Sequence, residues 1–408
     1  MSTAESSLLI RGIGRLLTMG EGGSAAPIAD AAVVISGGRI RYAGPVASLP
    51  GGLVRQASHD PSYVEIDAGG ACVIPGFVDA HTHLVWAGSR RAEFEARMAG
   101  VGYDGGGIRT TVEATRAASD QELLDLAVTR GRAMVRTGTT TVEIKSGYGL
   151  TPTDELRLLN IATQVGEVLP LRVEVTYLGA HVVPAGRDRA DYVREVIDTV
   201  PAAAQAGAGW CDVFCDEGVF TVAESRAILM AARDAGLGLR IHAEEIAPSG
   251  GAALAAELGC ASADHLEHVT ARDAADMARV GVVAVLLPTV TLSLRTGAFG
   301  QASVLRDAGV ELALATDCNP GTSWCESMPT AIRLACLAQG LSVTEAFRAA
   351  TLGSAHSLRR ADIGHLSPDA RGDVAILDAE HEADLVAHLG SPGVRSTIVG
   401  GEVVFAVA

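Results

Sequence analysis

The chain has 408 residues, of which 48% are hydrophobic, and its formal net charge is −16. This acidity argues against DNA, RNA or an anionic membrane as the main partner, because each of them binds basic protein surfaces. The seven cysteines form no CxxC pair, the start MSTAESSLLI lacks the basic and apolar parts of a signal peptide, and no apolar run approaches about 18 residues. The sequence therefore predicts a cytoplasmic protein without disulfides or membrane spans.

Both ends of the chain are expected to be β-rich. Near the N-terminus, AAVVISGGRIRYAG predicts a hairpin that turns at Gly37-Gly38. Near the C-terminus, VRSTIVGGEVVFAV predicts a second hairpin, which turns at Gly400-Gly401. Because neither end is long enough to bury a core alone, we expect residues 1–70 and 366–408 to form one small β-sandwich domain together.

Between residues 71 and 365, short apolar runs alternate with helical stretches rich in Ala, Leu, Glu and Arg. Eight such runs follow in chain order: CVIPGFVDAHTHL, TTTVEIKSGYG, LRVEVTYLGAHVVP, WCDVFCDEG, LRIHAEEI, ASADHLEHV, VVAVLLPTVTL and ELALATDCNPGT. Eight strand–helix units predict an α/β fold of the (β/α)8 TIM-barrel type, which typically needs about 250 residues. An open doubly wound sheet would usually have fewer strands and a glycine-rich phosphate turn, which we do not find.

Six of the 11 histidines follow predicted barrel strands, at the end where barrel enzymes hold their active sites. His81 and His83 follow the first strand and, two residues apart, point to the same face. The others at this end are His181, His242, His265 and His268, together with Asp317 after the eighth strand. Three imidazoles and one carboxylate suit zinc or iron with one coordination position open for water. We therefore predict that His81, His83, His242 and Asp317 bind one divalent metal ion.

Several stretches carry a resemblance to a known family. PGFVDAHTHL resembles the strand-one signature of the amidohydrolase superfamily, while KSGYGL and ATDCNPG are similar to the imidazolonepropionases within it. The likeness extends from about Val33 to Val404. It implies a metal-binding barrel with a side β-sandwich made from both termini. It also implies hydrolytic opening of the ring of 4-imidazolone-5-propanoate to N-formimino-L-glutamate, in histidine degradation.

The resemblance implies the same four metal ligands and adds roles for further residues. His265, in SADHL, matches a catalytic histidine. Glu245, three residues after His242, matches a substrate-contacting position and is a candidate proton shuttle. Further substrate contacts are implied at Arg90, Tyr148, His181, Asn319, Gly321 and Thr322. The expected partner is a small substrate with a carboxylate tail, and since relatives are often dimers, the resemblance also suggests a homodimer.

This sequence departs from the family pattern in two places. The loop Arg97–Ile108 is shorter than in many relatives, which leaves the role of Tyr103 open. Trp86-Ala87 stand where Phe-Gly is more usual, so a change in the pocket wall is expected.

Some residues also have a plainer interpretation. Arg90 is equally consistent with a surface arginine and with a guanidinium that binds the substrate's carboxylate through two hydrogen bonds. Glu244 suits the role of a helix N-terminal carboxylate as well as Glu245 does. Three cysteines near the predicted site are expected to be core residues: Cys211, Cys215 and Cys318.

The reaction itself is only partly specified. The resemblance places the lysine that bridges two ions on the fourth strand in binuclear relatives. The fourth run here, WCDVFCDEG, has no lysine, and Lys145 lies on the second run, so a single metal ion is expected. The attacking water would lose its proton to Asp317 or His265, and Glu245 or His265 would assist the leaving nitrogen. The rivals are a heterocycle aminohydrolase (a deaminase) on the same barrel and a metal-free scaffold, which would typically have lost ligands.

Overall fold

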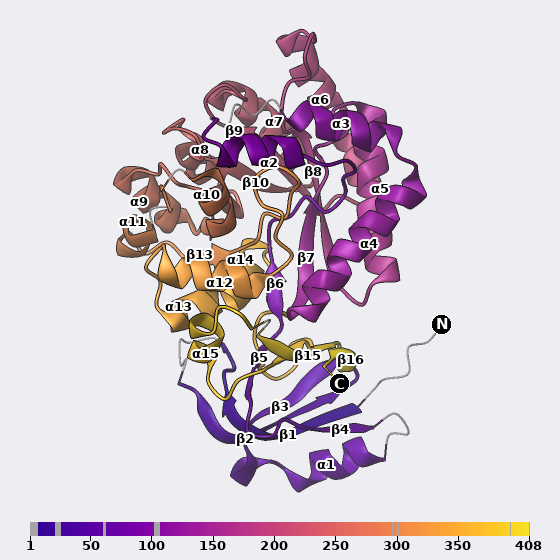
Figure 1. Cartoon of the computed structure of the whole chain (residues 1–408), viewed down its shortest axis with the longest axis vertical. Coiled ribbons are helices and arrows are strands. Elements are labelled where there is room, and N and C mark those ends of the chain that lie inside the picture. Colours follow the sequence, from indigo (N-terminus) through magenta and orange to yellow (C-terminus); the bar gives the residue numbers. More distant parts are fainter. Residues whose placement is uncertain are drawn as a thin grey trace.

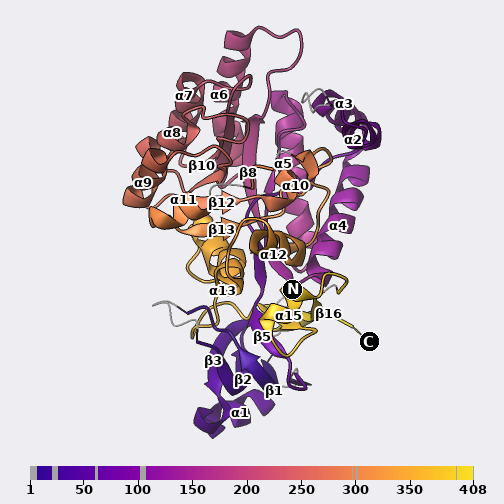
Figure 2. The same ribbon diagram turned by 60° about the vertical axis from the view of Figure 1, so that its left-hand side comes forward.

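The computed structural model describes residues 7–20, 26–59, 63–101, 107–295, 297–299, 302–391 and 393–407. The described residues form two eight-stranded sheets, one of them parallel and the other built from both ends of the chain. Figure 1 shows the parallel sheet with its helices in the upper part of the molecule and the terminal strands below. Figure 2 shows the same division after a turn about the vertical axis. Tyr103 lies outside the described residues.

The terminal sheet contains both predicted hairpins. Its strands are β1 (Ser7–Leu16), β2 (Ile28–Ser36), β3 (Arg39–Pro45), β4 (Val64–Asp67), β5 (Cys72–Pro75), β14 (Val374–Leu377), β15 (Val394–Val399) and β16 (Glu402–Ala406). Gly37-Gly38 and Gly400-Gly401 all have a positive φ, which glycine adopts without strain in the turns between β2 and β3 and between β15 and β16. β5 lies between β14 and β1 and so joins the two chain ends into one sheet.

The parallel sheet runs in chain order from its first strand to its last. Its strands are β6 (Phe77–Asp79), β7 (Thr139–Lys145), β8 (Arg172–Ala180), β9 (Trp210–Cys215), β10 (Gly238–Ala243), β11 (Ser262–His265), β12 (Val283–Leu286) and β13 (Leu312–Leu314). Beyond the strand ends, Thr82 and Cys318 form a parallel bridge, and Thr316 donates its backbone N–H and its hydroxyl to Asp79 at 3.0 and 2.6 Å. These contacts bring the last strand back to the first, and the predicted (β/α)8 barrel is confirmed.

Helices surround the barrel (Figure 1). They are α2 (Arg91–Met98), α3 (Ile108–Ala117), α4 (Asp120–Arg136), α5 (Pro152–Val168), α6 (Arg189–Gln205), α7 (Val222–Asp234), α8 (Gly251–Leu258), α9 (Ala271–Val280), α10 (Pro288–Leu294), α11 (Ala302–Asp307), α12 (Met328–Leu337), α13 (Val343–Arg348) and α14 (Ser354–Ser357), with α1 (Gly51–Ser58) and α15 (Glu382–Ala387) beside the terminal strands. Side-chain caps fix where the longer ones begin: Ser119 caps α4, Thr151 caps α5 and Thr221 caps α7. Within the described ranges, no helix has the length and apolar character needed to cross a bilayer.

The predicted first barrel strand, CVIPGFVDAHTHL, is two strands in the structure. β5 pairs in the terminal sheet and β6 in the barrel, with Gly76 between them. A Cβ atom on Gly76 would lie 2.2 Å from the Thr140 side chain, so only glycine lets the chain pass there. Residues 72–75, which the sequence analysis placed in the barrel, therefore pair with the terminal strands.

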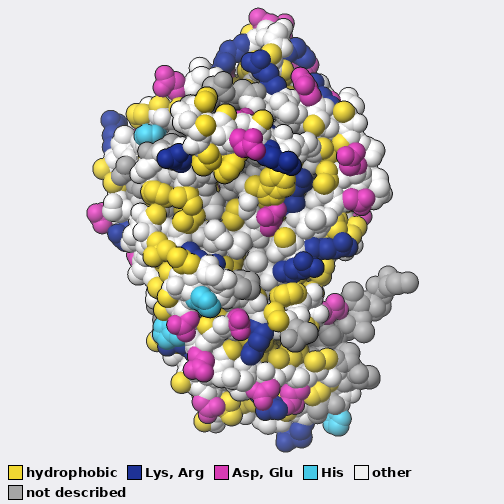
Figure 3. All heavy atoms as spheres, in the orientation of Figure 1, with side chains coloured by type: hydrophobic (Ala, Val, Ile, Leu, Met, Phe, Trp, Pro, Cys, Tyr) yellow, Lys and Arg dark blue, Asp and Glu magenta, His cyan; other side chains and the backbone are white. Residues whose placement is uncertain are grey.

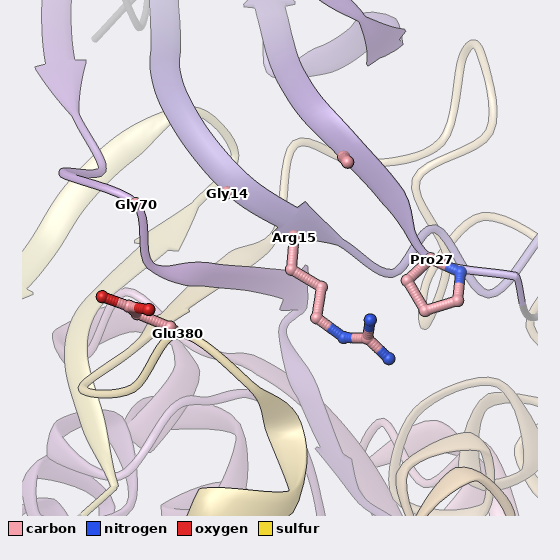
Figure 4. A pocket seen from close by; sticks show the side chains of 6 residues that line it. Gly14, Arg15, Pro27, Gly70 and Glu380 are labelled. Atoms are coloured by element: carbon pink, nitrogen blue, oxygen red, sulfur yellow. The ribbon is translucent and has the colours of Figure 1, made fainter.

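A small cavity of about 220 Å³ lies among the terminal strands (Figure 4). Gly14, Pro27, Gly70 and Glu380 line it together with Arg15, whose guanidinium donates to Glu382 at 2.7 Å. None of these residues lies at the ends of the barrel strands, and we assign the cavity no chemistry.

Candidate metal centre and active site

The four predicted metal ligands come together at the mouth of the barrel. Candidate ligand atoms of His81, His83 and His242 lie within 4.8 Å of one another, as do those of His81, His265 and Asp317. Asp317 Oδ1 lies 3.6 Å from His81 Nε2 and 3.4 Å from His83 Nε2. All five side chains are buried, with at most 3% of each residue exposed. The strand ends thus bring three imidazoles and one carboxylate to one point, with His265 beside them.

The donor atoms fit a divalent cation. His81 Nε2 and Asp317 Oδ1 are buried and have no hydrogen-bond partner, an arrangement that is costly unless something binds them. Burial, together with neighbouring cationic groups, lowers the pKa of His81 and of His83 well below the usual value, so both rings offer neutral nitrogen donors. Burial also raises the pKa of Asp317 to about 8, and a bound cation would favour the carboxylate form that a metal ligand needs.

Beneath the ligands lies a group of five fully buried charged side chains, which we call the strand cluster: Glu143, Lys145, Asp212, Arg240 and Asp264. Asp264 Oδ2 lies 2.6 Å from His81 Nδ1, and Asp212 Oδ2 lies 3.0 Å from His242 Nδ1. Carboxylates in this position fix the tautomer and orientation of metal-binding histidines. The strand cluster was not predicted, although the i, i+2 spacings of 143/145 and 240/242 indicate that the residues of each pair share a strand face.

Three acidic side chains surround His265. Its Nε2 lies 3.6 Å from Glu245 Oε2 and 4.0 Å from Asp317 Oδ2, and its Nδ1 lies 3.9 Å from Glu267 Oε2. Burial raises the pKa of Glu245 well above its usual value and that of Glu267 to about 8. His265 itself has φ +79°, a backbone conformation that non-glycine residues rarely adopt. The candidate proton carriers Glu245 and Asp317 therefore both lie within 4.0 Å of His265 Nε2. Glu267 is a further acid at this site and was not predicted there.

The structure separates the roles of Glu244 and Glu245. The Glu244 carboxylate accepts the backbone N–H groups of Ser249, Gly250 and Ala252, so it caps the start of α8. Glu245 faces His265 instead. Asp216 holds this loop by accepting the backbone N–H groups of residues 245, 246 and 247.

Tyr148 and His181 lie beside the ligand His83. The rings of His181 and His83 stack with centroids 5.2 Å apart, and the Tyr148 ring lies 5.4 Å from His181. Burial lowers the pKa of His181 to about 4, so this ring is neutral. The loop that carries Tyr148 is fixed by Glu155, whose carboxylate accepts three backbone N–H groups, those of residues 147, 149 and 150, at 2.7 to 2.8 Å. No sequence motif predicts this anchor.

Arg90 is 7% exposed, which excludes the surface-arginine interpretation. Its guanidinium donates through Nε and Nη2 to the Glu93 carboxylate at 2.7 to 3.1 Å. It also packs on Gly321, where a Cβ atom would lie 2.1 Å from Arg90 Nη1. Asn319 mainly organises this loop, because its Oδ1 accepts the N–H groups of Gly321 and Thr322 and its Nδ2 donates to Asp317 O.

A cleft of about 830 Å³ is lined in part by Arg90. Gly321 and Thr322 line it together with the apolar side chains of Phe94 and Trp324. Figure 3 shows hydrophobic and basic side chains side by side on the face of the molecule that carries α2. Arg90 and residues 320–322 therefore line an open cleft.

The remaining predictions near the site concern packing. Cys211, Cys215 and Cys318 are completely buried, and their prediction as core residues is confirmed. Trp86 is also fully buried, with the Arg130 guanidinium 3.3 Å from its ring centroid. Trp86 does not itself line the cleft at Arg90, but its ring packs edge-on against Trp324, which does.

Comparison with known proteins agrees with this geometry. Residues 72–404 match the amidohydrolase family. An imidazolonepropionase from Salinispora arenicola is 48% identical over 97% of this chain and 98% of its own length, and one from Mycolicibacterium smegmatis is 44% identical over 98% of both. Among solved structures, a triazine hydrolase from Arthrobacter aurescens has a TM-score of 0.75 at 20% identity, covering 98% of this chain and 95% of its own. An atrazine chlorohydrolase from the same species, complexed with zinc, has a TM-score of 0.72 at 19% identity with the same coverage.

The structural neighbours share the fold at low identity, whereas the imidazolonepropionases match over nearly the whole sequence. The chain therefore belongs to the amidohydrolase family and, within it, to the imidazolonepropionases.

Proposed function

We propose that this chain hydrolyses the ring of 4-imidazolone-5-propanoate to N-formimino-L-glutamate, a step of histidine degradation. The observation that carries the proposal is the joint position of five groups at the barrel mouth: three imidazole donors, the Asp317 carboxyl and the acid-flanked His265. This set combines a metal site with acid–base groups, which is what hydrolysis of a cyclic amide requires.

We propose that His81, His83, His242 and Asp317 hold one divalent ion, zinc or iron. Such an ion supplies a Lewis acid for the ring carbonyl and lowers the pKa of a water molecule to about 7. The only amine on the second barrel strand, Lys145 Nζ, lies 2.7 Å from Asp212 and 2.8 Å from Glu143. Because it is engaged there, it is not placed to bridge a second ion, which supports a single-ion site.

The residues around His265 define a route for the proton. The Asp317 carboxylate accepts the proton of the attacking water, and His265 Nε2 lies 4.0 Å from Asp317 and 3.6 Å from Glu245. Glu245, whose pKa burial raises well above the usual value, donates a proton to the ring nitrogen as the C–N bond breaks. The proton taken from water thus replaces the one given to the leaving nitrogen, and the residues return to their starting states.

On the substrate side, we propose that Arg90 binds the propanoate carboxylate and that Tyr148 and His181 contact the ring. The carboxylate of Glu93 holds two nitrogens of the Arg90 guanidinium and so presets its plane. The stacked rings of His83 and His181 place the proposed ring contact next to a metal ligand. Gly321 and Thr322 complete this side of the site.

Three further proposals concern the protein as a whole. All seven cysteines are free thiols, which supports a reducing, cytoplasmic compartment. The terminal strands and the barrel are proposed as two domains. The boundary expected after residue 70 is moved to Gly76, because β5 pairs in the terminal sheet and β6 in the barrel. A homodimer is proposed from the family alone.

The test is incubation of the zinc- or iron-loaded protein with freshly generated 4-imidazolone-5-propanoate, following the loss of its ultraviolet absorbance. We expect formiminoglutamate as product and no ammonia. Unchanged absorbance would refute the proposal, and release of ammonia with the ring intact would instead identify the heterocycle aminohydrolase.

A further inference from the structure

Lys145 is the only lysine among the 32 lysines and arginines of the chain. Every other basic position is an arginine, including all those on the surface. The single lysine lies on β7 inside the barrel and is 1% exposed. A chain that otherwise uses only arginine therefore has an ammonium group at one buried position, beneath the metal ligands.

The surroundings of Lys145 explain why an ammonium is needed. Its Nζ lies 2.8 Å from Glu143 Oε1 on the same strand, 2.7 Å from Asp212 Oδ2 on β9 and 3.8 Å from Asp264 Oδ2 on β11. An ammonium has three donors directed to different sides, whereas the donors of a guanidinium all lie in one plane. Three carboxylates on three strands thus fit the geometry of lysine and not that of arginine.

Two of these carboxylates, Asp212 and Asp264, also contact proposed metal ligands. Asp212 Oδ2 contacts both Lys145 Nζ at 2.7 Å and His242 Nδ1 at 3.0 Å. Asp264 Oδ2 contacts both Arg240 Nη2 at 3.1 Å and His81 Nδ1 at 2.6 Å. His242 and His81 therefore each end a chain of three groups, in the order cation, carboxylate and imidazole.

We propose that Lys145 is a positioning residue for the metal: its ammonium fixes Asp212, and Asp212 fixes the His242 ring with its ligand nitrogen toward the ion. Arg240 and Asp264 do the same for His81. The proposal rests on the ligand set given under the proposed function. The rival explanation is that the strand cluster only stabilises the barrel, since breaking one partner out of a buried ion pair is destabilising by itself.

The test compares two variants that treat buried charge differently. Lys145→Met/Glu143→Gln removes one positive and one negative charge, so the sum of buried charge is kept while Asp212 loses its cation. Glu143→Gln is the control, because it changes the same neighbourhood but leaves the Lys145–Asp212 contact in place. Zinc affinity is measured by competition with a chelator, and folding by circular dichroism and thermal unfolding.

We expect the double variant to bind zinc roughly 10- to 100-fold more weakly than the wild type, the range seen when outer partners of metal ligands are removed. Glu143→Gln should bind zinc within about threefold of the wild type. Wild-type affinity in a folded double variant would overturn the positioning role. If the wild type binds no zinc, or binds more than one ion, the proposed metal site itself is refuted. Failure of the positioning role and failure of the metal site are therefore distinguishable.

A second measurement needs no variant. In protein grown with lysine labelled with ¹³C at Cε, position 145 is the only lysine and gives one side-chain signal. Zinc titration should shift this signal and saturate at one equivalent, because the ion acts on Lys145 through His242 and Asp212. A signal that does not move while one zinc ion binds would overturn the proposal even if the double variant fails to fold.

Discussion

The proposed site combines two regions that are built in different ways. In the strand cluster beneath the ligands, charged side chains contact one another from strand to strand. Around the mouth lie the rim loops, which are residues 146–150, 244–249 and 317–323. There the backbone N–H groups donate to a side-chain acceptor, which is Glu155, Asp216 or Asn319. The orientation of the His81 and His242 rings thus depends on charged side chains of regular strands. Asp317 and the proposed substrate contacts depend on anchored loops.

Backbone conformation shows the same contrast. In the rim loops, Leu150, Glu244 and Asp317 have φ values of 52°, 59° and 46°, which are uncommon outside glycine. None of the five residues of the strand cluster has a positive φ. Strained conformations persist only where their surroundings hold them, which is the role of the loop anchors. Damage to one region should therefore leave the other intact.

The largest effect is expected when a ligand above the strand cluster is removed. His242→Ala takes away one imidazole donor, so zinc binding should be lost and turnover should fall by more than the roughly 10²–10⁴-fold expected of a general acid–base group. The barrel should still fold, because the residue lies at its mouth. Elemental analysis and circular dichroism check both points, and an unfolded protein would show that His242 is structural instead.

Next in size is the loss of the proposed proton carrier. His265→Ala should keep the metal and lose roughly 10²–10⁴-fold in kcat, because no other imidazole lies between Glu245 and Asp317 in the described structure. His268→Ala is the matched control, since that residue is exposed and should have almost no effect. Near-normal turnover in His265→Ala would reassign His265 to packing.

A smaller effect is expected at the edge of the cleft. Arg90→Ala should keep the metal and lower kcat/KM by about 10- to 150-fold, the equivalent of roughly 1.5–3 kcal/mol for a charge-assisted hydrogen bond. Arg90→Lys should restore only part of this, because an ammonium cannot form the bidentate fork. The exposed neighbour supplies the control variant, Arg91→Ala. If the wild type hydrolyses an imidazolone without the carboxylate equally well, Arg90 does not bind the substrate.

The smallest effect is expected from loosening a rim loop. Glu155→Gln leaves one carbonyl oxygen for three backbone N–H groups, so the loop carrying Tyr148 should become mobile and KM should rise about tenfold, the equivalent of roughly 1.4 kcal/mol. Metal content should not change. Glu167→Gln, on the exposed side of the same helix, should leave KM unaltered, and a rise in that control too would mean that α5 as a whole is sensitive.

Much of the fold followed from local pattern. The two Gly-Gly hairpins and the eight strand–helix units were predicted because turn residues and apolar periodicity depend only on residues close together in the sequence. The division of CVIPGFVDAHTHL into β5 and β6 was not predicted. It depends on the packing of Thr140, a residue distant in the sequence, against Gly76. Predictions failed where a contact, and no local pattern, decides the structure.

The same distinction applies to the site. The ligands were predictable because histidine is rare in this chain and recurs at strand ends. The strand cluster was not predicted, because charged residues at alternate positions, such as Glu143 and Lys145, are more typical of the solvent-facing side of a sheet. Glu155 and Asp216 also gave no signal, because a carboxylate that accepts backbone N–H groups looks like any other acid in the sequence.

The most direct test of this two-region account measures zinc affinity and KM side by side in Lys145→Met/Glu143→Gln and in Glu155→Gln. The account predicts a crossed result: the first variant binds zinc roughly 10- to 100-fold more weakly but has a normal KM once saturated with metal. The second binds zinc normally and has a raised KM. If zinc affinity and KM change together in both variants, the strand cluster and the rim loops do not act separately, and the account is wrong.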